Sequence, residues 1–431
     1  GRLAITWTNT SDGNGNVSTV IVDPRIAPVT TRGTIGADVY VGSEYAGDVL
    51  AGHRGNDTFI GSLGADTMEG GEGIDTISYQ YAKTGVRIVL WVGVAGGHEG
   101  AEALGDFYTS MENAIGSAYD DNITGNLGAN RLQGGKGNDS LSAGQYFGDE
   151  NVDTLEGGSG NDEYYVDTTT DQVIEGTGTG TGNTLANRIT GNDGANTLRG
   201  DSGNDSLNGG DGSDRLEGGT GNDTFYVDRS SDSIVETSSG GTDRLYVGVS
   251  YTLAASAYVE SMATNSSSGI DAINLKGNNI AQTITGNAGT NTLTGLGGND
   301  VINGGSGSDR VYGGTGNDVL YGGGSDSKRD TFVFNTTLRS NVDTIKDFST
   351  RYDRIELDND VFTRAGSVGG LKSDAFVSYS RARDREDRIV YDKATGALYY
   401  DQDGTGSAAQ VKFAQLAKNL AMNYADFIVI G

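Results

Sequence analysis

The chain has no cysteine, two prolines and two histidines among its 431 residues. Without cysteine it has neither a disulfide framework nor a thiolate metal site, and this absence suits an oxidising and a reducing compartment equally. Two prolines beside 71 glycines exclude collagen, which needs both residues in a fixed repeat. Basic residues are also scarce. The 30 Lys and Arg oppose 58 Asp and Glu, and the formal charge of −28 argues against nucleic acid as a partner.

Long apolar runs are missing as well. The sequence contains no uninterrupted stretch of about 18 apolar residues, so we expect no membrane span. It starts at Gly1 without the basic and apolar segments of a secretory signal peptide, so we expect a processed product or an excised part of a longer chain. Only 35% of the residues are hydrophobic, which is little for a self-sufficient core. We therefore expect a ligand to help the chain fold.

A nine-residue repeat is the most abundant feature of the sequence. Asp or Asn recurs at nine-residue steps, and an apolar residue stands two positions later, as in Asp205 and Leu207. The glycines before the Asp tolerate the positive φ of tight turns, and the residues after it form a short strand. Two units close one coil of 18 residues, which places turns of the same edge about 4.8 Å apart. Four arrays contain these steps: Asp48 to Asp75, Asp121 to Asp162, Asn187 to Asp223 and Gln282 to Asp318.

Stacked turns of this kind bring like charges together. Carboxylates one strand spacing apart repel each other, and turn carbonyls lack partners, unless a cation lies between consecutive turns. Oxygen-only ligands suit Ca²⁺, and about eight or more ions would remove most of the charge of −28. The alternative is that the Asp and Asn side chains only stabilise turns by hydrogen bonds. The pairs in 18-residue register are Asp48/Asp66, Asp57/Asp75, Asp121/Asp139, Asp205/Asp223 and Asp300/Asp318, with the mixed pairs Asn187/Asp205, Asn196/Asp214 and Asn291/Asp309 as weaker or edge sites.

Several units match the pattern GGxGxDxUx, in which U is apolar, in tandem. Examples are residues 209–217, 218–226, 304–312 and 313–321. Over residues 33–431 these units resemble the RTX (repeats-in-toxin) family of haemolysin-type calcium-binding, type I secreted bacterial proteins. The resemblance implies an all-β fold, a calcium-stapled parallel β-roll in several blocks with spacers between them and a C-terminal β-rich cap.

The resemblance also implies ligand sets, in which each ion lies between two turns 18 residues apart. One set is Asp201, Gly203 and Asp205 with Gly218, Thr220 and Asp223; a second is Leu296, Gly298 and Asp300 with Gly313, Thr315 and Asp318; a third is His53, Gly55 and Asp57 with Gly70, Glu72 and Asp75. The other candidate calcium ligands are Asp48, Asp66, Asp121, Gly134, Lys136, Asp139, Asp153, Asp162, Asn196, Gly209, Asp211, Asp214, Gly304, Ser306, Asp309 and Asp330.

We divide the chain by these arrays. Residues 1–32 are the end of an upstream region or a linker, and 33–79, 116–165 and 282–334 are blocks 1, 2 and 4. Residues 166–227 hold a loop, expected up to residue 186, followed by block 3. Residues 80–115 and 228–281 are spacers, the second with an alternating strand and a short helix.

Residues 335–431 leave the repeat. We expect a cap with two hairpins in RIVYDKATGALYYDQDGTG, a short amphipathic helix at 415–423 and a last strand at Phe427–Ile430. The resemblance implies an uncleaved type I secretion signal in this tail, although a last core strand explains the same residues. Around Asp401 and Asp403 a plain hairpin turn is favoured over a further ion site.

Catalytic constellations are sparse. The segment His98-Glu99-Gly100-Ala101-Glu102 has the first half of a zinc-protease HExxH and lacks the second histidine. No serine lies in GxSxG, and Asp23-Pro24 is read as a turn rather than as a cleavage site. We expect no catalytic residue, and the sequence leaves open whether the whole protein is an enzyme.

Together these features predict an extracellular or cell-surface calcium-binding RTX module that folds on Ca²⁺ binding after export, as part of a surface, adhesive or matrix protein. The alternative is the C-terminal folding and secretion half of an exported hydrolase or polysaccharide-modifying enzyme with an upstream catalytic domain. Expected partners are calcium, the type I secretion machinery, and cell-surface glycan or further copies of the chain.

Overall fold

The computed structural model describes residues 18–21, 28, 30–42, 47–91, 103–144, 151–166, 168, 171–324, 327–338 and 341–431. Its regular elements are β-strands and two short 3-10 helices. The chain forms two compact units: Gly1–Asp223 with Ser231–Ser233, and Thr224–Ser230 with Ile234–Gly431. In the described part of the chain, no helix is long and apolar enough to cross a membrane. The all-β parallel fold expected from the repeat is confirmed.

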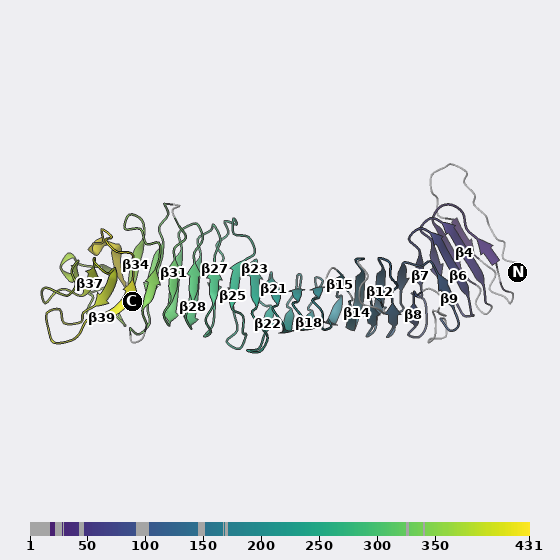
Figure 1. Cartoon of the computed structure of the whole chain (residues 1–431), viewed down its shortest axis with the longest axis horizontal. Coiled ribbons are helices and arrows are strands. Elements are labelled where there is room, and N and C mark those ends of the chain that lie inside the picture. The colour runs from purple at the N-terminus through teal and green to yellow at the C-terminus, as the bar shows by residue number, and fades with distance from the viewer. Residues whose placement is uncertain are drawn as a thin grey trace. The chain divides into compact units, whose positions relative to one another are not determined.

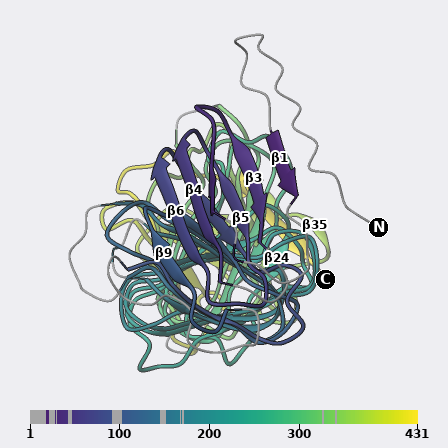
Figure 2. The same ribbon diagram turned by 90° about the vertical axis from the view of Figure 1, so that its right-hand side faces the viewer.

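The first unit begins with two layers of parallel strands. Figure 2 shows β4, β6 and β9 side by side in one layer, and β1, β3, β5 and β7 pair in the other. Consecutive strands of a layer are 18 residues apart, as in the pairs Leu50–Met68 and Phe59–Ile77. The strands of this part are β1 (Ser18–Ile21), β2 (Thr30–Arg32), β3 (Asp38–Val41), β4 (Val49–Arg54), β5 (Thr58–Ile60), β6 (Thr67–Glu72), β7 (Thr76–Ser78), β8 (Arg87–Val89), β9 (Phe107–Thr109) and β10 (Asn113–Ile115).

The same unit continues through the second and third arrays. Its further strands are β11 (Asn122–Thr124), β12 (Arg131–Lys136), β13 (Ser140–Ser142), β14 (Thr154–Tyr165), β15 (Gln172–Ile174), β16 (Thr177–Thr181), β17 (Arg188–Thr190), β18 (Thr197–Ser202), β19 (Ser206–Asn208) and β20 (Arg215–Thr220). Residues 166–186, expected to be a loop, contain β15 and β16. Because β16 pairs with β14 on one side and β18 on the other, the stack is continuous between the second and third arrays.

The second unit repeats the stacked pattern and ends in the cap (Figure 1). In Figure 1 the strands β23, β25, β27 and β31 follow one another along one side of this unit, and β28 lies on the other side. Its roll strands are β21 (Thr224–Val227), β23 (Arg244–Val247), β24 (Tyr251–Thr252), β25 (Ser261–Thr264), β26 (Leu275–Lys276), β27 (Thr283–Thr285), β28 (Thr292–Gly297), β29 (Val301–Asn303), β30 (Arg310–Thr315), β31 (Val319–Tyr321), β32 (Thr331–Phe334), β33 (Asp343–Ile345) and β34 (Arg354–Asp358), and β22 (Ser233–Val235) contains the boundary between the units.

The spacer 228–281 forms strands and turns, so the short helix expected there is wrong. Its strands β23 and β25 pair with each other and with β21 and β27. Leu245 and Met262 of this spacer are buried in line with Phe225 and Ile284 of the arrays. Burial of an apolar side chain in each rung therefore overrides the change in sequence texture.

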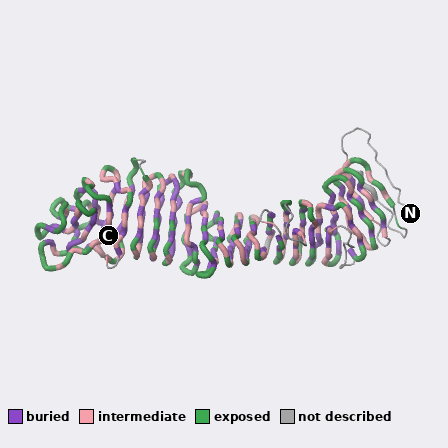
Figure 3. Tube along the Cα trace, in the orientation of Figure 1, coloured by how far each residue is buried: buried purple, intermediate pink, exposed green. Residues whose placement is uncertain are grey.

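One buried apolar residue per strand makes the core of both units. Figure 3 shows buried residues alternating with exposed ones along the stacked strands, as side chains do on a pleated strand. Pairing aligns these residues one above another, so the core is a ladder rather than a sphere. Members with at most 1% exposure include Leu50, Phe59, Met68, Ile77, Ile123, Leu132, Leu141, Leu155, Tyr164, Ile189, Leu198, Leu207, Leu216, Phe225, Ile284, Leu293, Ile302, Val311, Leu320 and Phe332.

The cap follows the roll with antiparallel strands. Its elements are β35 (Gly369–Gly370), η1 (Ser373–Ala375), β36 (Phe376–Val377), β37 (Ile389–Asp392), β38 (Ala397–Tyr400), β39 (Val411–Gln415), η2 (Tyr424–Asp426) and β40 (Phe427–Ile430). The sheet β37–β38–β39 is antiparallel, and β40 pairs in parallel with β34. Phe427 and Val429 are fully buried, so β40 is a core strand of this unit. The helix expected at 415–423 is wrong: Gln415 ends β39, and Asn419 has φ 59°, which a right-handed helix excludes.

Three turns hold a non-glycine residue in the left-handed region. His53, Asp201 and Leu296 occupy the second position of the nonapeptide, where the pattern asks for glycine, with φ of 81°, 75° and 80°. A residue with a Cβ is destabilised there by about 1–2 kcal/mol. These turns keep the shape that the repeat needs in spite of this strain.

We expect Leu296→Gly to raise the free energy of unfolding by about 1 kcal/mol, because glycine adopts φ 80° without strain. Denaturant unfolding in saturating calcium measures the change. The matched control is Leu296→Ala, which removes the side chain and keeps the Cβ strain. A Gly variant no more stable than the Ala variant contradicts this prediction.

Candidate metal centre

The aspartates of the repeat form a hydrogen-bonded ladder along each edge of the stack. One carboxylate oxygen of each Asp accepts the backbone N–H of the corresponding residue in the preceding turn. Asp57 donates to Asp75 at 2.8 Å, Asp205 to Asp223 at 2.7 Å and Asp300 to Asp318 at 2.8 Å. The same bond joins Asp48 to Asp66, Asp121 to Asp139, Asp139 to Asp162, Asn130 to Asp153, Asn187 to Asp205, Asn196 to Asp214, Gln282 to Asp300, Asn291 to Asp309 and Asp309 to Asp330.

The second oxygen of many of these carboxylates is buried without a partner. Among the described residues, Oδ2 of six ladder aspartates accepts no hydrogen bond: Asp57, Asp75, Asp139, Asp162, Asp205 and Asp300. Each of these residues is at most 2% exposed. Burying a carboxylate oxygen without a partner is costly, so these atoms are expected to meet a cation.

A second oxygen lies beside each orphaned Oδ2. An added Cβ on Gly200 would lie 2.2 Å from Asp205 Oδ2 and 2.5 Å from the carbonyl oxygen of Gly218 in the next turn. The corresponding distances at Gly295 are 2.1 Å to Asp300 Oδ2 and 2.5 Å to Gly313 O. Carboxylate and carbonyl oxygens of consecutive turns thus converge on the space that glycine leaves open.

The electrostatics of the turns favour a positive ion. Burial, reinforced by neighbouring carboxylates, raises the pKa of Asp57 to about 6, of Asp205 and Asp300 to about 7 and of Asp139 to about 8. The charged form is therefore disfavoured without a counter-ion. A hard divalent ion removes the repulsion, and an oxygen-only donor set suits Ca²⁺ better than a transition metal. The residues present fit calcium.

The structure brings together the residues of the three ligand sets implied by the resemblance. Strand pairing places Asp201 opposite Gly219, His53 opposite Gly71, and Leu296 opposite Gly314, so both turns of each set are neighbours. Figures 1 and 3 show the stacked strands of the two units from which these turns project. Whether each of these atoms ligates an ion stays a prediction.

Other candidate ligands are used in hydrogen bonds. Both oxygens of Asp121 accept bonds from Ser117, through its backbone N–H and its hydroxyl. The Asn196 amide accepts the N–H of Asn192 and donates to the carbonyl oxygen of Gly176. Asn130, Gln282 and Asn291 likewise donate to preceding carbonyls, those of Glu112, Val259 and Ile273. An amide nitrogen thus makes these turn contacts without an ion.

The remaining candidates lie in the same stacked turns. Gly209 and Gly304 face the Oδ2 atoms of Asp214 and Asp309, and Gly134 faces that of Asp139. Lys136 pairs with Ser159 in the next turn. Candidates for which only a place in these turns is reported are Asp211 and Ser306, between these glycines and aspartates in sequence.

Sequence reasoning missed the members of the ladder that lie outside the tandem units. Asp38, Asp106, Asp343 and Asp353 accept the same N–H bonds, from Thr34 or from Asp66, Asp318 and Asp330. Each stands two residues before a buried apolar side chain: Tyr40, Tyr108, Ile345 and Ile355. This Asp-x-apolar signal would have found them without the glycines.

One ladder position is closed by tyrosines. Asp106 accepts the hydroxyl hydrogen of Tyr79, and the hydroxyls of Tyr79 and Tyr108 are hydrogen bonded to each other. Burial raises the pKa of Asp106 to about 7. A phenol here meets an oxygen that an ion would meet in a regular turn.

The sparse catalytic candidates find no support in the described residues. His98 and Asp23-Pro24 lie outside them, and His53 is exposed on a repeat turn. The hairpin residue Asp401 accepts the N–H of Asp403, as in a plain turn.

Calcium affinity is expected to rise with pH between about 5 and 8. The pKa values of the turn aspartates in the folded, metal-free protein lie at about 6 to 8, above the value of about 4 in an unfolded chain. The metal-free fold therefore loses stability as pH rises through this range, and an ion must displace protons below it. Each displaced proton weakens apparent affinity by about tenfold per pH unit below the pKa.

Calcium titrations by calorimetry at pH 5.5, 6.5 and 7.5, in buffers of different ionisation enthalpy, measure both the affinity and the released protons. An affinity that is constant over this range, with no proton release, contradicts the assignment.

Comparison with known proteins agrees with this chemistry. The family model of the RTX calcium-binding nonapeptide repeat (4 copies) matches residues 44–77, 115–145, 147–173, 181–216, 190–225, 208–235, 277–311 and 303–326. A search of curated proteins finds no match. The matches cover the turns in which the orphaned carboxylate oxygens lie. The chain therefore is an RTX-repeat protein, which binds Ca²⁺ through several copies of the nonapeptide along its length.

Proposed function

We propose that the chain is an extracellular calcium-binding module that folds on Ca²⁺ binding after export and forms part of a surface, adhesive or matrix protein. The observation that carries the first half is the ladder of buried carboxylates with orphaned oxygens, such as Asp205 and Asp300. In the micromolar calcium of a cytosol these groups repel each other and keep the chain unfolded. In millimolar calcium the free energy of binding becomes free energy of folding.

The final strand suits an exported roll that must be closed at its end. Phe427 and Val429 of β40 are buried, and β40 pairs with β34 of the roll. A segment that emerges last and completes the sheet is compatible with a C-terminal type I secretion signal that later serves as a core strand. Export by that machinery is part of the proposal.

An uncharged face of the second unit supports the surface role. Outward positions of β21, β23, β25, β27, β29 and β31 form two columns that flank the buried ladder. The columns are Thr224, Arg244, Ser261, Thr283, Val301 and Val319, and Tyr226, Tyr246, Ala263, Thr285, Asn303 and Tyr321. Arg244 is the one charged residue in these two described columns, although the protein carries a charge of −28.

Two tyrosines give this face an aromatic platform. The rings of Tyr226 and Tyr246 are stacked with centroids 5.6 Å apart and an interplanar angle of 22°. Tyr226 is 40% exposed. Flat aromatic and hydroxyl-bearing positions at regular rung spacing suit a neutral sugar polymer or the same face of another copy. The opposite sheet, by contrast, holds the ion pair of Arg310 and Glu356 at 2.6 Å.

Calcium-dependent folding is tested by circular dichroism of the chelator-treated chain. We expect a large gain of β signal when Ca²⁺ is added at millimolar concentration, and no gain with Mg²⁺, which tolerates the flexible turn geometry poorly. The same β signal before and after chelation contradicts the mechanism.

The surface role is tested by sedimentation in saturating calcium, with and without an insoluble neutral glucan. We expect the chain to sediment with the glucan or as ordered polymers alone, and Tyr226→Ala to lose most of this sedimentation. Tyr312→Ala on the opposite sheet is the matched control. A chain that stays in the supernatant in both arms contradicts the surface role and leaves the folding mechanism intact.

A further inference from the structure

Two turns depart from the nonapeptide pattern in the same way. A regular turn has glycine at its first position and aspartate at its sixth, as in Gly200 and Asp205. In one departing turn these positions hold Glu175 and Gly180. In the other they hold Glu236 and Gly241, so the acidic residue and the glycine have changed places in both.

The exchange recurs in a common sequence context. The segments before the two glutamates are DQVIE and DSIVE, and each follows an array that ends in YYVD or FYVD. The family matches that reach these arrays stop at residues 173 and 235, just before the glutamates. The repeat pattern therefore assigns no role to either glutamate.

Glu175 fills the place of the missing aspartate. Gly180 is 18 residues after Asp162 and pairs with it across β14 and β16. An added Cβ on Gly180 would lie 2.9 Å from Glu175 Oε2 and 3.2 Å from its Cβ and Cγ. The contact mirrors the one in a regular turn, where a Cβ on Gly200 would meet Asp205 Oδ2 at 2.2 Å. The glutamate reaches from the first position into the space of the sixth.

Oxygens without a cationic partner surround this place. Glu175 is fully buried, and its Oε1 accepts no hydrogen bond among the described residues. Asp162 is 2% exposed and its Oδ2 is likewise without a partner. The Tyr164 hydroxyl donates to Glu175 Oε2 at 2.7 Å. This hydroxyl also lies beside Asp162 Oδ2, because a Cβ on Gly157 would be 2.1 Å from the first and 2.2 Å from the second.

We propose that Glu175 and Asp162 hold an additional divalent cation, Ca²⁺, in a site whose carboxylate comes from the first position of the turn. Two buried carboxylates with one unpartnered oxygen each supply hard, anionic ligands, which calcium prefers. Tyr164 fixes the other oxygen of Glu175 and so orients Oε1. The site rests on the calcium chemistry of the repeat and is independent of a surface role.

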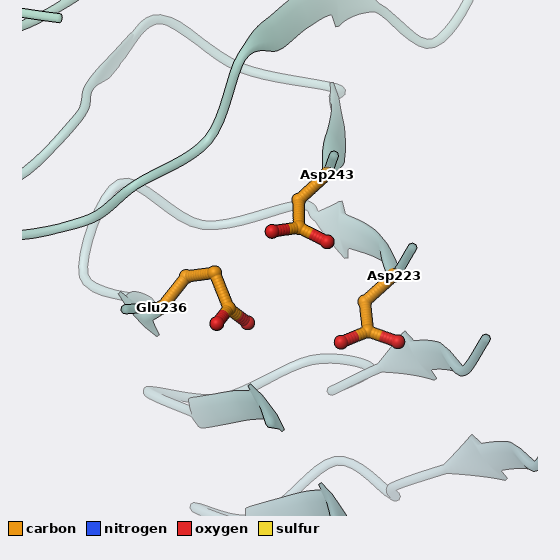
Figure 4. Close-up of side chains that lie close together, drawn as sticks. All are labelled: Asp223, Glu236 and Asp243. Atoms are coloured by element: carbon orange, nitrogen blue, oxygen red, sulfur yellow. The ribbon is translucent and has the colours of Figure 1, made fainter. Parts of the chain in front are cut away.

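The second copy of the exchange has a similar environment within its own unit. Figure 4 shows Glu236 and Asp243 with their carboxylates turned toward each other. One oxygen of each lies within 4.8 Å of the other, and both residues are buried. Oε1 of Glu236 accepts the N–H of Thr237 at 2.8 Å, which orients the side chain.

The test is a count of bound calcium in the full chain by equilibrium dialysis at saturating Ca²⁺ and pH 7.5. We expect Glu175→Gln to bind one ion fewer than the unchanged chain, because the amide keeps the shape and the Tyr164 bond and loses the charge. Asp300→Asn, in a regular turn, shows the loss that a ligand variant causes. Glu156→Gln is the matched control, because Glu156 pairs with Arg131 at 2.6 Å on the strand surface, and it keeps the full count.

A restored regular turn makes the test independent of folding defects in the Gln variant. Glu175→Gly alone is expected to lose the ion, and Glu175→Gly combined with Gly180→Asp to regain it. Gly180 is outside the positive-φ residues, so aspartate fits its backbone.

Two outcomes overturn the proposal. One is a Gln variant that binds as many ions as the unchanged chain, which would mean that the two carboxylates share a proton instead of an ion. The other is a double variant that binds no more calcium than Glu175→Gly.

Discussion

Repulsion between buried carboxylates is the constraint on which the stacked turns depend. Strand pairing sets the turns one rung apart, and the apolar ladder of residues such as Leu207 and Leu293 makes that spacing favourable. The same spacing buries Asp205 and Asp300 beside like charges, which raises their pKa values. Core and turns therefore oppose each other until a divalent ion neutralises the carboxylates. Calcium thereby couples the concentration of an ion to the folding of the chain.

The ends of the arrays solve the same problem without an ion. Where a repeat turn meets a spacer that presents a carbonyl oxygen, an amide replaces the carboxylate, as in Asn291 facing Ile273. Where a spacer brings a phenol, Tyr79 donates to Asp106. Each device supplies a hydrogen-bond donor where the regular turn would supply a cation. The departures from the repeat are thus chemically related to its rule, and the exchange at Glu175 extends that relation from the sixth position to the first.

Function is distributed between turns and faces. The turns carry the acidic groups and the glycines, while the outward columns of the second unit carry uncharged residues such as Tyr226 and Thr285. A protein with this division can be stabilised by calcium along its edges and present a neutral aromatic surface between them. The cap then protects the last strands, since a roll that ended on an open edge would pair with other chains.

The sequence by itself determined the parallel roll, the 18-residue register and calcium as the ligand, because a period of nine fixes which residues share a turn and which enter the core. It could not determine which oxygens are free. Asp121 and Asp205 look alike in sequence, yet Ser117 occupies both oxygens of the first, whereas Oδ2 of the second has no partner. It also misjudged 166–186 and 228–281, whose strands follow the register set by their neighbours rather than by their own pattern. Only the tertiary structure decided these points, because hydrogen bonds between turns depend on contacts that local spacing does not encode.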